Sequence, residues 1–270
     1  MTSILLIGCG KMGGALLRGW MQNNPATKVQ VIESDTALAQ HIQSDISLPV
    51  LFALRDLPAD YRPDVVVIAV KPQSLDDLLP QLADRFTNHS PLYVSIAAGK
   101  TLGYYETHLG SHVSIIRAMP NTPSLIGMGI TALCVNRMVY HAQAALAETL
   151  FIQVGEVVKI ENESLMDVVT ALSGSGPAYL FLFADAMVEA GVALGLSEPT
   201  ARRLALATVR GSSELAAQPG TSLEQLRKNV TSPGGTTESA LSVLMENDAL
   251  KTLMKQAMEK AAARSRQLAT

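Results

Sequence analysis

The feature that most constrains the fold is a glycine-rich turn near the start of the chain. Gly8, Gly10 and Gly13 have the spacing G-x-G-x-x-G, directly after the apolar run 4–7 and directly before a helical pattern at 12–22. In a βαβ unit such glycines let the backbone approach a pyrophosphate, which binds at the amino end of the helix. The spacing alone is a weak signal, but strand, turn and helix agree here. The pattern therefore predicts a dinucleotide site.

The first half of the chain alternates short apolar runs with amphipathic or turn-rich stretches. The run Val65-Val66-Val67-Ile68 lacks alternation, which is typical of parallel strands covered on both faces. Helices are predicted between several strands, for example at 74–85. Strands are predicted at 3–8, 29–33, 49–53, 65–70, 92–97 and 113–118, with two less regular strands at 130–135 and 156–160. These patterns favour an α/β domain, a doubly wound parallel sheet, over residues 1–160.

After residue 160 the strand signal stops, and helical patterns continue to residue 270. They cover 164–172, 177–194, 198–217, 223–229, 237–247 and 249–268, with turn signals such as Gly174-Ser175-Gly176-Pro177 between them. The stretch 178–196 is about long enough to span a membrane, but an acid such as Asp185 or Glu189 costs roughly 2.5–3.5 kcal/mol at mid-bilayer. We therefore expect a helix buried nearly all round in protein, within an all-α domain over residues 161–270.

Composition narrows the possible partners and compartments. The 270 residues carry a net charge of −3 and no long basic run, which argues against nucleic acid as a partner. Neither Cys9 nor Cys134 has a metal-ligand spacing, and no histidine does, so no metal site is expected. Two thiols make no disulfide framework and no basic region precedes the first strand. These features favour a reduced, cytoplasmic setting over secretion, and no membrane association.

An acidic residue ends the second predicted strand. Glu33 lies 20 residues after Gly13, where a carboxylate can accept the ribose 2′-hydroxyl of NAD. Ser34 and Asp35 leave the cofactor choice open, because a serine hydroxyl can hydrogen-bond a 2′-phosphate whereas two acids would repel it.

Three later segments also follow predicted strands. They are Ala69-Val70-Lys71-Pro72, Ser95-Ile96-Ala97-Ala98-Gly99 and Arg117-Ala118-Met119-Pro120-Asn121-Thr122-Pro123. In an open α/β sheet the ligand lies outside the carboxyl ends of the strands, so all three are expected to rim the cofactor crevice.

A second candidate anion site lies far along the chain. Thr231-Ser232-Pro233-Gly234-Gly235-Thr236-Thr237 leads into the helical pattern at 237–247. Its glycines let backbone N–H groups converge, its threonines add hydroxyls, and the helix dipole favours a negative charge. One site suits a pyrophosphate and the other a small carboxylate, which together indicate an oxidoreductase.

The side chains available narrow the reaction class. Oxidising an alcohol usually needs a lysine or histidine base, and no obvious one stands in the second half's ligand-facing motifs. Reducing a C=N bond is less demanding, because a protonated imine is already a hydride acceptor. A related two-domain dehydrogenase of hydroxy acids remains an alternative, although it needs such a base. A non-enzymatic nucleotide sensor would leave the loop 231–237 without a purpose.

Taken together, six motifs closely resemble those of the Δ1-pyrroline-5-carboxylate reductase family, the last enzyme of proline biosynthesis. In that family's order they are Gly8-Cys9-Gly10-Lys11-Met12-Gly13, Ala69–Pro72, Ser95–Gly99, Arg117–Pro123, Ser173-Gly174-Ser175-Gly176-Pro177-Ala178-Tyr179 and the segment 226–244 around the loop. The resemblance covers essentially the whole chain. It implies a Rossmann domain, a helical dimerisation domain, and hydride transfer from NADPH or NADH to 1-pyrroline-5-carboxylate.

The resemblance also implies a homodimer or a higher assembly of dimers, in which the substrate loop of one chain faces the nicotinamide of the other. Thr237 would hydrogen-bond the ring nitrogen and is the expected proton donor. The substrate carboxylate would be held by Ser232, Gly234, Gly235, Thr236 and Thr237. Glu163 and Asn229 match polar positions near the substrate and nicotinamide.

Motifs and resemblance together give a set of candidate cofactor residues. They are Gly8, Cys9, Gly10, Lys11, Met12, Gly13, Glu33, Ser34, Asp35, Asp56, Ala69, Val70, Lys71, Pro72, Ala97, Ala98, Met119, Pro120 and Asn121. Many members of the family have small polar or basic residues where this chain has Glu33-Ser34-Asp35, and an asparagine near Asp56. These departures leave the preference between NADPH and NADH open, but not the chemistry.

Overall fold

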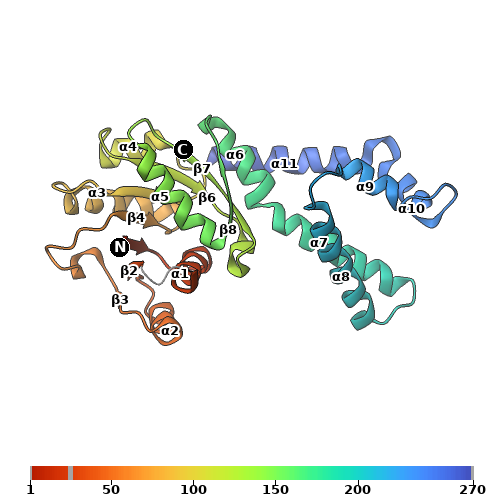
Figure 1. Cartoon of the computed structure of the whole chain (residues 1–270), viewed down its shortest axis with the longest axis horizontal. Helices are drawn as coiled ribbons and strands as arrows, with labels where there is room; N and C mark the ends of the chain where they lie inside the picture. The colour runs from red at the N-terminus through yellow and green to blue at the C-terminus, as the bar shows by residue number, and fades with distance from the viewer. Residues whose placement is uncertain (1, 24–26, 269–270) are drawn as a thin grey trace. The chain divides into compact units, whose positions relative to one another are not determined.

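The computed structural model describes residues 2–23 and 27–268 of the chain. They fall into two compact units, one of residues 1–175 with 261–270, and one of residues 176–260. In the described residues every strand lies in the first unit, and the second is helical (Figure 1). The sequence-based domain boundary at 160/161 coincides with the end of the last strand, and the helical turns that follow it pack with the first unit.

The core of the first unit is one sheet of eight strands in the order β3-β2-β1-β4-β5-β6-β7-β8. The strands from β3 to β6 are parallel in this order, β7 runs antiparallel to β6, and β8 runs parallel to β7. The strands are β1 Ser3–Ile7, β2 Lys28–Ile32, β3 Val50–Leu51, β4 Val65–Ile68, β5 Leu92–Ser95, β6 Ile115–Met119, β7 Gly129–Val135 and β8 Gly155–Lys159. The doubly wound sheet expected from the sequence is confirmed.

Successive side chains of each strand enter opposite faces of the sheet, and both faces are covered. Ile4 and Leu6 of β1 join the buried cluster that includes Trp20 of α1 and Phe151 of α5. Leu5 and Ile7 join the other cluster, beneath α3 and α4. The helices are α1 Lys11–Asn23, α2 Thr36–Ile46, α3 Leu75–Arg85, α4 Leu102–Leu109 and α5 His141–Phe151.

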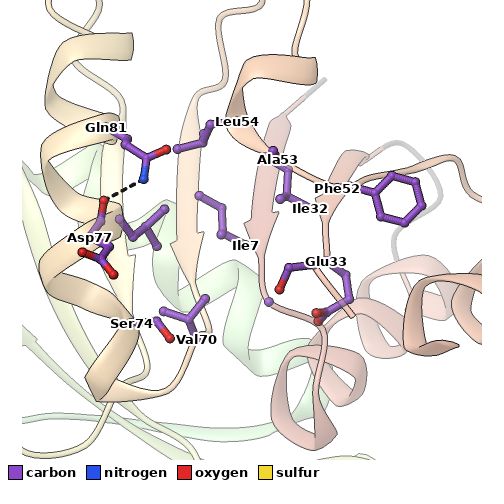
Figure 2. Close-up of a pocket in the computed structure, with 13 residues that line it drawn as sticks. Ile7, Ile32, Glu33, Phe52, Ala53, Leu54, Val70, Ser74, Asp77 and Gln81 are labelled. Atoms are coloured by element: carbon purple, nitrogen blue, oxygen red, sulfur yellow. Dashed lines mark hydrogen bonds between the residues drawn. The ribbon is translucent and has the colours of Figure 1, made fainter. Parts of the chain in front are cut away.

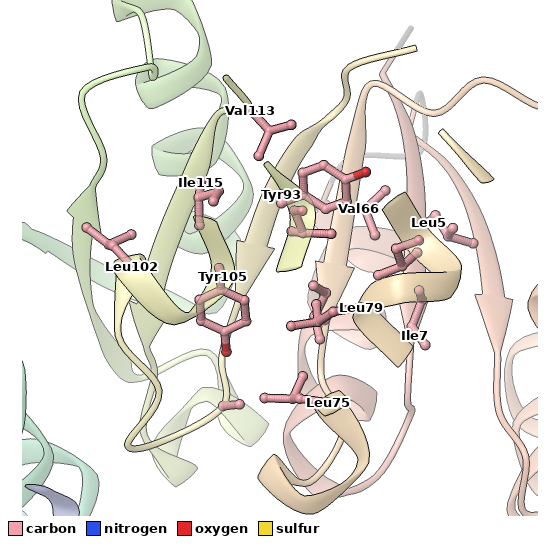
Figure 3. Close-up of a cluster of buried hydrophobic side chains, with 14 of the residues drawn as sticks. Leu5, Ile7, Val66, Leu75, Leu79, Tyr93, Leu102, Tyr105, Val113 and Ile115 are labelled. Carbon is pink, nitrogen blue, oxygen red and sulfur yellow. The ribbon is translucent and has the colours of Figure 1, made fainter. Parts of the chain in front are cut away.

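Figure 3 shows the second of these clusters. Leu79 of α3 and Tyr105 of α4 face the strands, where Val66, Tyr93 and Ile115 meet them. These side chains are at most 3% exposed, so the parallel sheet is held by apolar contacts on this face as on the other. Such packing fixes the carboxyl ends of the strands, which carry the candidate cofactor residues.

Short turns of 3-10 helix connect several elements of this unit. They are η1 Leu54–Asp56, η2 Pro72–Ser74, η3 Thr122–Ile126, η4 Ile152–Val154 and η5 Glu163–Leu165. Two of them, η2 and η3, follow strand ends that the sequence marks with prolines, and in both a proline occupies the first turn. A fixed proline φ suits that position because the missing N–H has no partner there.

The turn predicted at 174–177 is wrong. The chain stays helical through α6 Met166–Val169, a π-helical stretch η6 Thr170–Gly174 and α7 Gly176–Ala193. The N–H of Ser175 bonds the carbonyl of Thr170 over 2.8 Å, one residue farther back than in an α-helix. Pro177 cannot donate a bond to the preceding turn, and the wider π turn accommodates this loss without ending the helix.

The second unit contains α7, α8 Glu198–Ala216, α9 Leu223–Asn229, α10 Thr236–Met245, the turn η7 Glu246–Asp248 and most of α11 Ala249–Gln267. Helices α7 and α8 approach closely at small residues, since a Cβ on Gly191 would lie 3.3 Å from that of Ala201. The last turns of α11 belong to the first unit, where Ser265 donates a hydrogen bond to Asp167 over 2.6 Å.

The prediction that the helix at 178–196 is buried nearly all round does not hold for a single chain. Of the residues of α7 only Ala184 is buried, whereas Phe181 is 70% and Leu182 is 71% exposed. The stretch 163–193 is also the one described helix that is long and apolar enough to cross a membrane. The sequence correctly indicates that the helix is apolar around most of its circumference. The other helices of a single chain, however, leave most of that apolar surface exposed.

Candidate functional site

The glycine turn joins β1 to α1 at the carboxyl edge of the sheet, and its three glycines meet different surroundings. Gly8 has φ +87°, and a Cβ there would lie 2.8 Å from the carbonyl oxygen of Ala69. A Cβ on Gly13 would clash with the carbonyl oxygen of Gly8. A Cβ on Gly10 would meet nothing within 4 Å. Gly8 and Gly13 are thus required by the fold, whereas Gly10 borders open space.

That open space has the chemistry of a pyrophosphate site. Helix α1 begins at Lys11, so its first N–H groups have no partner within the helix and point toward Gly10 and the space beside it. The helix dipole adds partial positive charge, and Lys11 is exposed. A bare backbone at Gly10 lets a phosphate approach these donors closely, so the residues present fit a dinucleotide.

Glu33 directly follows β2 and is held by backbone donors. Its Oε2 accepts the N–H of Cys9 over 2.7 Å, and its Oε1 accepts the N–H of Asp35 over 2.9 Å. The residue is 8% exposed. The carboxylate therefore joins the glycine turn to the turn that opens α2, and both of its oxygens retain a lone pair for a further donor.

Glu33 lines a cleft of about 400 Å³ at the carboxyl edge of the sheet. Figure 2 shows Glu33 on one side of this cleft, Asp77 of α3 on the other, and Ile7 and Val70 between them. Together the sequence-predicted residues Gly8, Glu33, Ser34 and Val70 line it. Phe52, Ala53, Leu54, Ser74, Leu78 and Gln81, which the sequence did not single out, complete much of its wall.

Two acids assigned to the cofactor site are engaged elsewhere. Asp35 caps α2, since its Oδ1 accepts the N–H of Leu38 over 3.0 Å. Asp56 caps the turn η1, since its Oδ2 accepts the N–H of Ala53 over 2.9 Å. The cleft wall is formed here by Ala53 and Leu54, and Asp56 is not part of it.

The remaining cofactor candidates follow neighbouring strands at the same edge. Lys71 and Pro72 follow β4, Ala97 and Ala98 follow β5, and Met119 ends β6. The N–H of Ala97 is held over 3.2 Å by the Ser95 hydroxyl, which also contacts the Tyr105 hydroxyl at 2.5 Å. Pro120 and Asn121 come next, and the Asn121 side chain accepts the N–H of Ile130 over 2.9 Å. The structure thus brings these strand ends to one edge, as the sequence predicts for parallel strands.

Two buried side chains near this edge, Cys9 and Tyr105, have raised pKa values. Burial, and then the charge of Glu33, raises the pKa of the Cys9 thiol to about 12. Burial likewise raises the pKa of Tyr105 to about 12, against smaller lowering effects of its Ser95 hydrogen bond and of Arg117. A neutral, buried thiol is a packing group and not a nucleophile.

Glu163 lies at the start of η5 and pairs with a buried arginine. Its Oε1 accepts from the Arg117 Nη1 and from the N–H of Leu102, both over 2.6 Å. The Arg117 side chain is 6% exposed and that of Glu163 is 30% exposed. This pair joins β6, the start of α4 and the start of the helical segment after β8. The sequence analysis places Arg117 in a motif but assigns it no role. An arginine within a buried strand indicates that an acidic partner lies nearby, because a buried charge is costly without one.

The loop 231–237 lies in the second unit, between α9 and α10. Gly235 is the N-cap of α10, Gly234 has φ +69°, and the N–H of Gly234 is held by the Glu238 carboxylate over 2.7 Å. The loop backbone therefore already binds one carboxylate in the free chain. The carboxylate bound there is that of Glu238, from the first turn of α10.

The residues assigned to the substrate divide between the two units. Ser232, Gly234 and Thr236 are exposed, and Gly235 and Thr237 are half-buried. The side-chain Oδ1 of Asn229 accepts from Gln225 Nε2 over 2.8 Å. Thr237 lies in the first turn of α10, at the positive end of its dipole. Glu163 belongs to the first unit. Among the described residues, no group of three histidine, cysteine, aspartate or glutamate side chains could hold a metal ion.

Comparison with protein families gives one match in each half of the chain. Residues 163–268 match the family described as pyrroline-5-carboxylate reductase dimerisation. Residues 3–99 match the family described as NADP oxidoreductase, coenzyme F420-dependent. The first match includes Glu163 and the loop 231–237, and the second includes the glycine turn and the cleft.

Curated relatives match almost the whole chain. The pyrroline-5-carboxylate reductase of Pseudomonas aeruginosa is 38% identical over 98% of this chain and 96% of its own length. The enzyme of the same name from a Synechocystis strain is 37% identical over 97% of each chain.

Solved structures agree with this result. A pyrroline-5-carboxylate reductase from Coxiella burnetii has a TM-score of 0.91 at 35% identity, covering 100% of this chain and 99% of that one. The Plasmodium falciparum pyrroline carboxylate reductase, solved with NADP bound, has a TM-score of 0.87 at 30% identity, covering 100% and 98%.

Proposed function

The chain belongs to the pyrroline-5-carboxylate reductase family, and from this premise we propose that it reduces the C=N bond of 1-pyrroline-5-carboxylate to give L-proline. It is an NAD(P)H-dependent oxidoreductase. When bound, the reduced nicotinamide supplies the hydride for this reduction. The tasks left to the chain are to bind and orient two ligands, to neutralise a carboxylate and to protonate a nitrogen.

The first unit holds the cofactor. The amino end of α1 and the bare backbone at Gly10 receive the pyrophosphate, and Glu33 receives the ribose next to the adenine in the adjoining cleft. The edge continues toward β6, where further strand ends orient the rest of the dinucleotide. These are Val70–Pro72, Ala97–Ala98 and Met119–Asn121. A parallel sheet supplies this edge because all of these strands end on the same side.

The loop 231–237 holds the substrate carboxylate. The N–H of Gly234 donates to a carboxylate in the free chain, that of Glu238, and this contact supports the assignment. We propose that the substrate carboxylate takes the place of Glu238 at this donor, with Ser232, Gly235 and Thr236 completing the cradle. The dipole of α10 strengthens such binding.

Thr237 is the proposed proton donor to the ring nitrogen. Its position in the first turn of α10 places a hydroxyl beside the carboxylate cradle, as an α-imino acid requires. A neutral hydroxyl is enough here, since the nitrogen becomes strongly basic as the C=N bond is reduced. Glu163 and Asn229 are proposed to lie near the substrate as polar groups. The hydrogen bonds of Glu163 with Leu102 and Arg117 both use Oε1, so Oε2 is the oxygen proposed to face the ligand.

The family match over residues 163–268 is to a dimerisation domain, which supports a homo-oligomer. The finer assignment is a homodimer, or a higher assembly of dimers, in which the loop 231–237 of one chain completes the site of the other. It is supported by the exposed apolar surface of α7, including Phe181 and Leu182.

The setting and the division of labour are proposed in the same way. Residues 1–160 form the dinucleotide-binding domain and residues 161–270 the helical dimerisation and substrate domain. A cytoplasmic location suits a soluble biosynthetic reductase with free cysteines. A net charge of −3 suits neither nucleic acid nor an anionic membrane surface as a partner.

The observation that carries the function is the loop 231–237, with Gly234 at positive φ and its N–H bonded to a carboxylate, inside a family-matched region. The test is to supply the purified chain with 1-pyrroline-5-carboxylate and either reduced nicotinamide cofactor. Cofactor oxidation that forms proline in equal amount supports the proposal. Oxidation of a hydroxy acid in the reverse direction, with no reduction of the imine, would refute it.

A further inference from the structure

Glu33 is held in one orientation at the entrance to the cleft. Its two oxygens accept the N–H groups of Cys9 and Asp35 over 2.7 and 2.9 Å, and these donors belong to the two turns on either side of it. Because both carboxylate oxygens are hydrogen-bonded, the side chain cannot rotate away from a ligand without breaking at least one of these bonds. The carboxylate of Glu33 is therefore a fixed part of the cleft wall.

The rest of the wall does not compensate this charge. The 13 lining residues include the acids Glu33 and Asp77, on opposite sides of the cleft, and no lysine or arginine (Figure 2). Arg55 is adjacent in sequence to the lining residue Leu54, but its side chain is 89% exposed and lies 4.0 Å from Asp56. An additional anion entering this cleft would meet carboxylates without a lining cation.

The amino end of α2 is the other group that could attract an anion here. Free N–H groups at a helix start bind phosphate in many proteins. In this chain Asp35 already occupies that end, because its Oδ1 accepts the N–H of Leu38 over 3.0 Å. Its carboxylate offsets the dipole at the place where a phosphate would otherwise gain from it. The Ser34 hydroxyl is then the one neutral side-chain donor of the Glu33-Ser34-Asp35 turn.

We propose that Glu33 makes this chain selective for NADH over NADPH. The two cofactors differ only by a phosphate on the 2′-hydroxyl of the ribose next to the adenine. A fixed carboxylate with free lone pairs accepts hydrogen bonds from ribose hydroxyls, and it repels a phosphate at the same position. The inference rests on the proposed function, since it concerns the cofactor of the same reaction. It concerns affinity, so it is measurable without turnover.

The test compares dissociation constants by calorimetric titration. The ligands are NADH, NADPH, and the fragments ADP-ribose and 2′-phospho-ADP-ribose, which isolate the adenine half. We expect the wild-type chain to bind each 2′-hydroxyl ligand at least about tenfold more tightly than its phosphorylated partner, a modest effect for one close charge. The ratio should decrease as salt is added, because the discrimination is electrostatic.

Two variants test the residue itself. Glu33→Gln keeps the shape and removes the charge, and Glu33→Ala removes the side chain. Both should lower the NADPH-to-NADH ratio of dissociation constants at least about fivefold, chiefly by tighter binding of NADPH. Glu156→Gln is the matched control, since Glu156 is an exposed acid on β8 that lines neither this cleft nor the pocket beside Gly10. It removes the same charge from the molecule and should leave the ratio unchanged.

Each other outcome has a definite meaning. A wild-type chain that binds NADPH as tightly as NADH overturns the inference. Glu33 variants that weaken both cofactors equally overturn it too, because they show a purely structural role. Binding of neither cofactor overturns the proposed function together with the inference. Preferential binding of NADH without reduction of the imine overturns the proposed function alone.

Discussion

At the scale of single residues, the three glycines of the first turn have two different roles. Gly8 and Gly13 are required because backbone atoms occupy the space that a Cβ would take. Gly10 faces open space, so the fold alone does not require a glycine there. The proposed role of Gly10 is to leave room for a ligand, and a change at Gly10 should therefore separate binding from folding.

We predict that Gly10→Val lowers the affinity for reduced nicotinamide cofactors at least a hundredfold, since its side chain would fill the space next to the free N–H groups of α1. The unfolding midpoint should change little, because the new atoms meet no protein neighbour. Titration with cofactor and thermal unfolding measure the two effects. Gly13→Val is the contrasting variant, and it should fail to fold. Unchanged cofactor affinity in Gly10→Val would place the site elsewhere.

The proton donor gives a second prediction at this scale. Thr237→Ala should lower kcat by about 10²–10⁴-fold, the range of general-acid contributions, while the dissociation constant of the cofactor stays the same. Thr237→Ser retains the hydroxyl and should recover most of the activity. Steady-state kinetics with saturating cofactor measure kcat. Full turnover of Thr237→Ala would assign the proton to water or another group.

Individual site residues were predictable from the sequence to the extent that their role is local. The glycine turn, Glu33 and the loop 231–237 are each defined by neighbours in the chain. Partners that are distant in sequence were not predictable. Examples are Asp77 across the cleft from Glu33, and Arg117 bonded to Glu163. Asp56 was assigned to the cofactor site, but its carboxylate accepts a hydrogen bond from Ala53 in its own turn instead.

At the scale of elements, the buried pair of Arg117 and Glu163 joins the sheet to the helical segment that follows it. Arg117 lies in β6, and the Glu163 carboxylate also accepts the first N–H of α4. Two bonds to one carboxylate oxygen thus connect three elements. This is the point at which the α/β part of the chain gives way to the helices.

Breaking this pair should destabilise the first unit. Glu163→Ala leaves the Arg117 guanidinium buried without its partner, and we expect a loss of about 3 kcal/mol in the free energy of unfolding. The double variant Arg117→Met with Glu163→Leu should recover most of the loss, because neither charge then remains buried. Urea unfolding at one protein concentration measures both. A double variant as unstable as Glu163→Ala would mean that packing, rather than the unpaired charge, causes the loss.

The elements themselves were largely predictable. All eight strands follow from apolar runs bounded by turn residues, and the helices after residue 197 follow from caps, prolines and glycines. The error at 174–177 has a physical cause, since Gly-Ser-Gly-Pro is a turn signal in isolation. Here the π-helical turn absorbs the proline, and the chain remains helical into α7. The antiparallel direction of β7 was not among the sequence-based predictions, although the connection of residues 120–128 is shorter than the dozen or so residues that a parallel crossover usually needs.

At the scale of the whole molecule, a single chain leaves the apolar side chains of α7 exposed to solvent. Leu180, Phe181, Leu182 and Phe183 are all at least 46% exposed. Contiguous apolar surface of this kind marks an association site. The apolar pattern of the helix follows from the sequence, and the burial expected from it would come from the proposed second copy.

The proposed sharing of sites between chains predicts complementation. A Gly10→Val chain lacks a cofactor site and a Thr237→Ala chain lacks the proton donor, so each is nearly inactive alone. A mixed dimer has one site that carries neither change. Unfolding the two chains together and refolding them should restore up to about one quarter of wild-type activity, as random pairing of equal amounts implies. Two chains refolded separately and then combined at low temperature are the control. An absence of recovery after co-refolding, with mixed dimers present, would mean that each site is built within one chain.

The central claim is reduction of a cyclic imine by a reduced nicotinamide, and the most direct measurement is a coupled mass balance. Purified chain, 1-pyrroline-5-carboxylate and NADH or NADPH are combined, nicotinamide absorbance is followed, and L-proline is quantified. The account predicts one proline formed for each cofactor oxidised, and no such reaction in Thr237→Ala beyond its small residual rate. No cofactor oxidation with the imine, while a hydroxy acid is turned over, would contradict it.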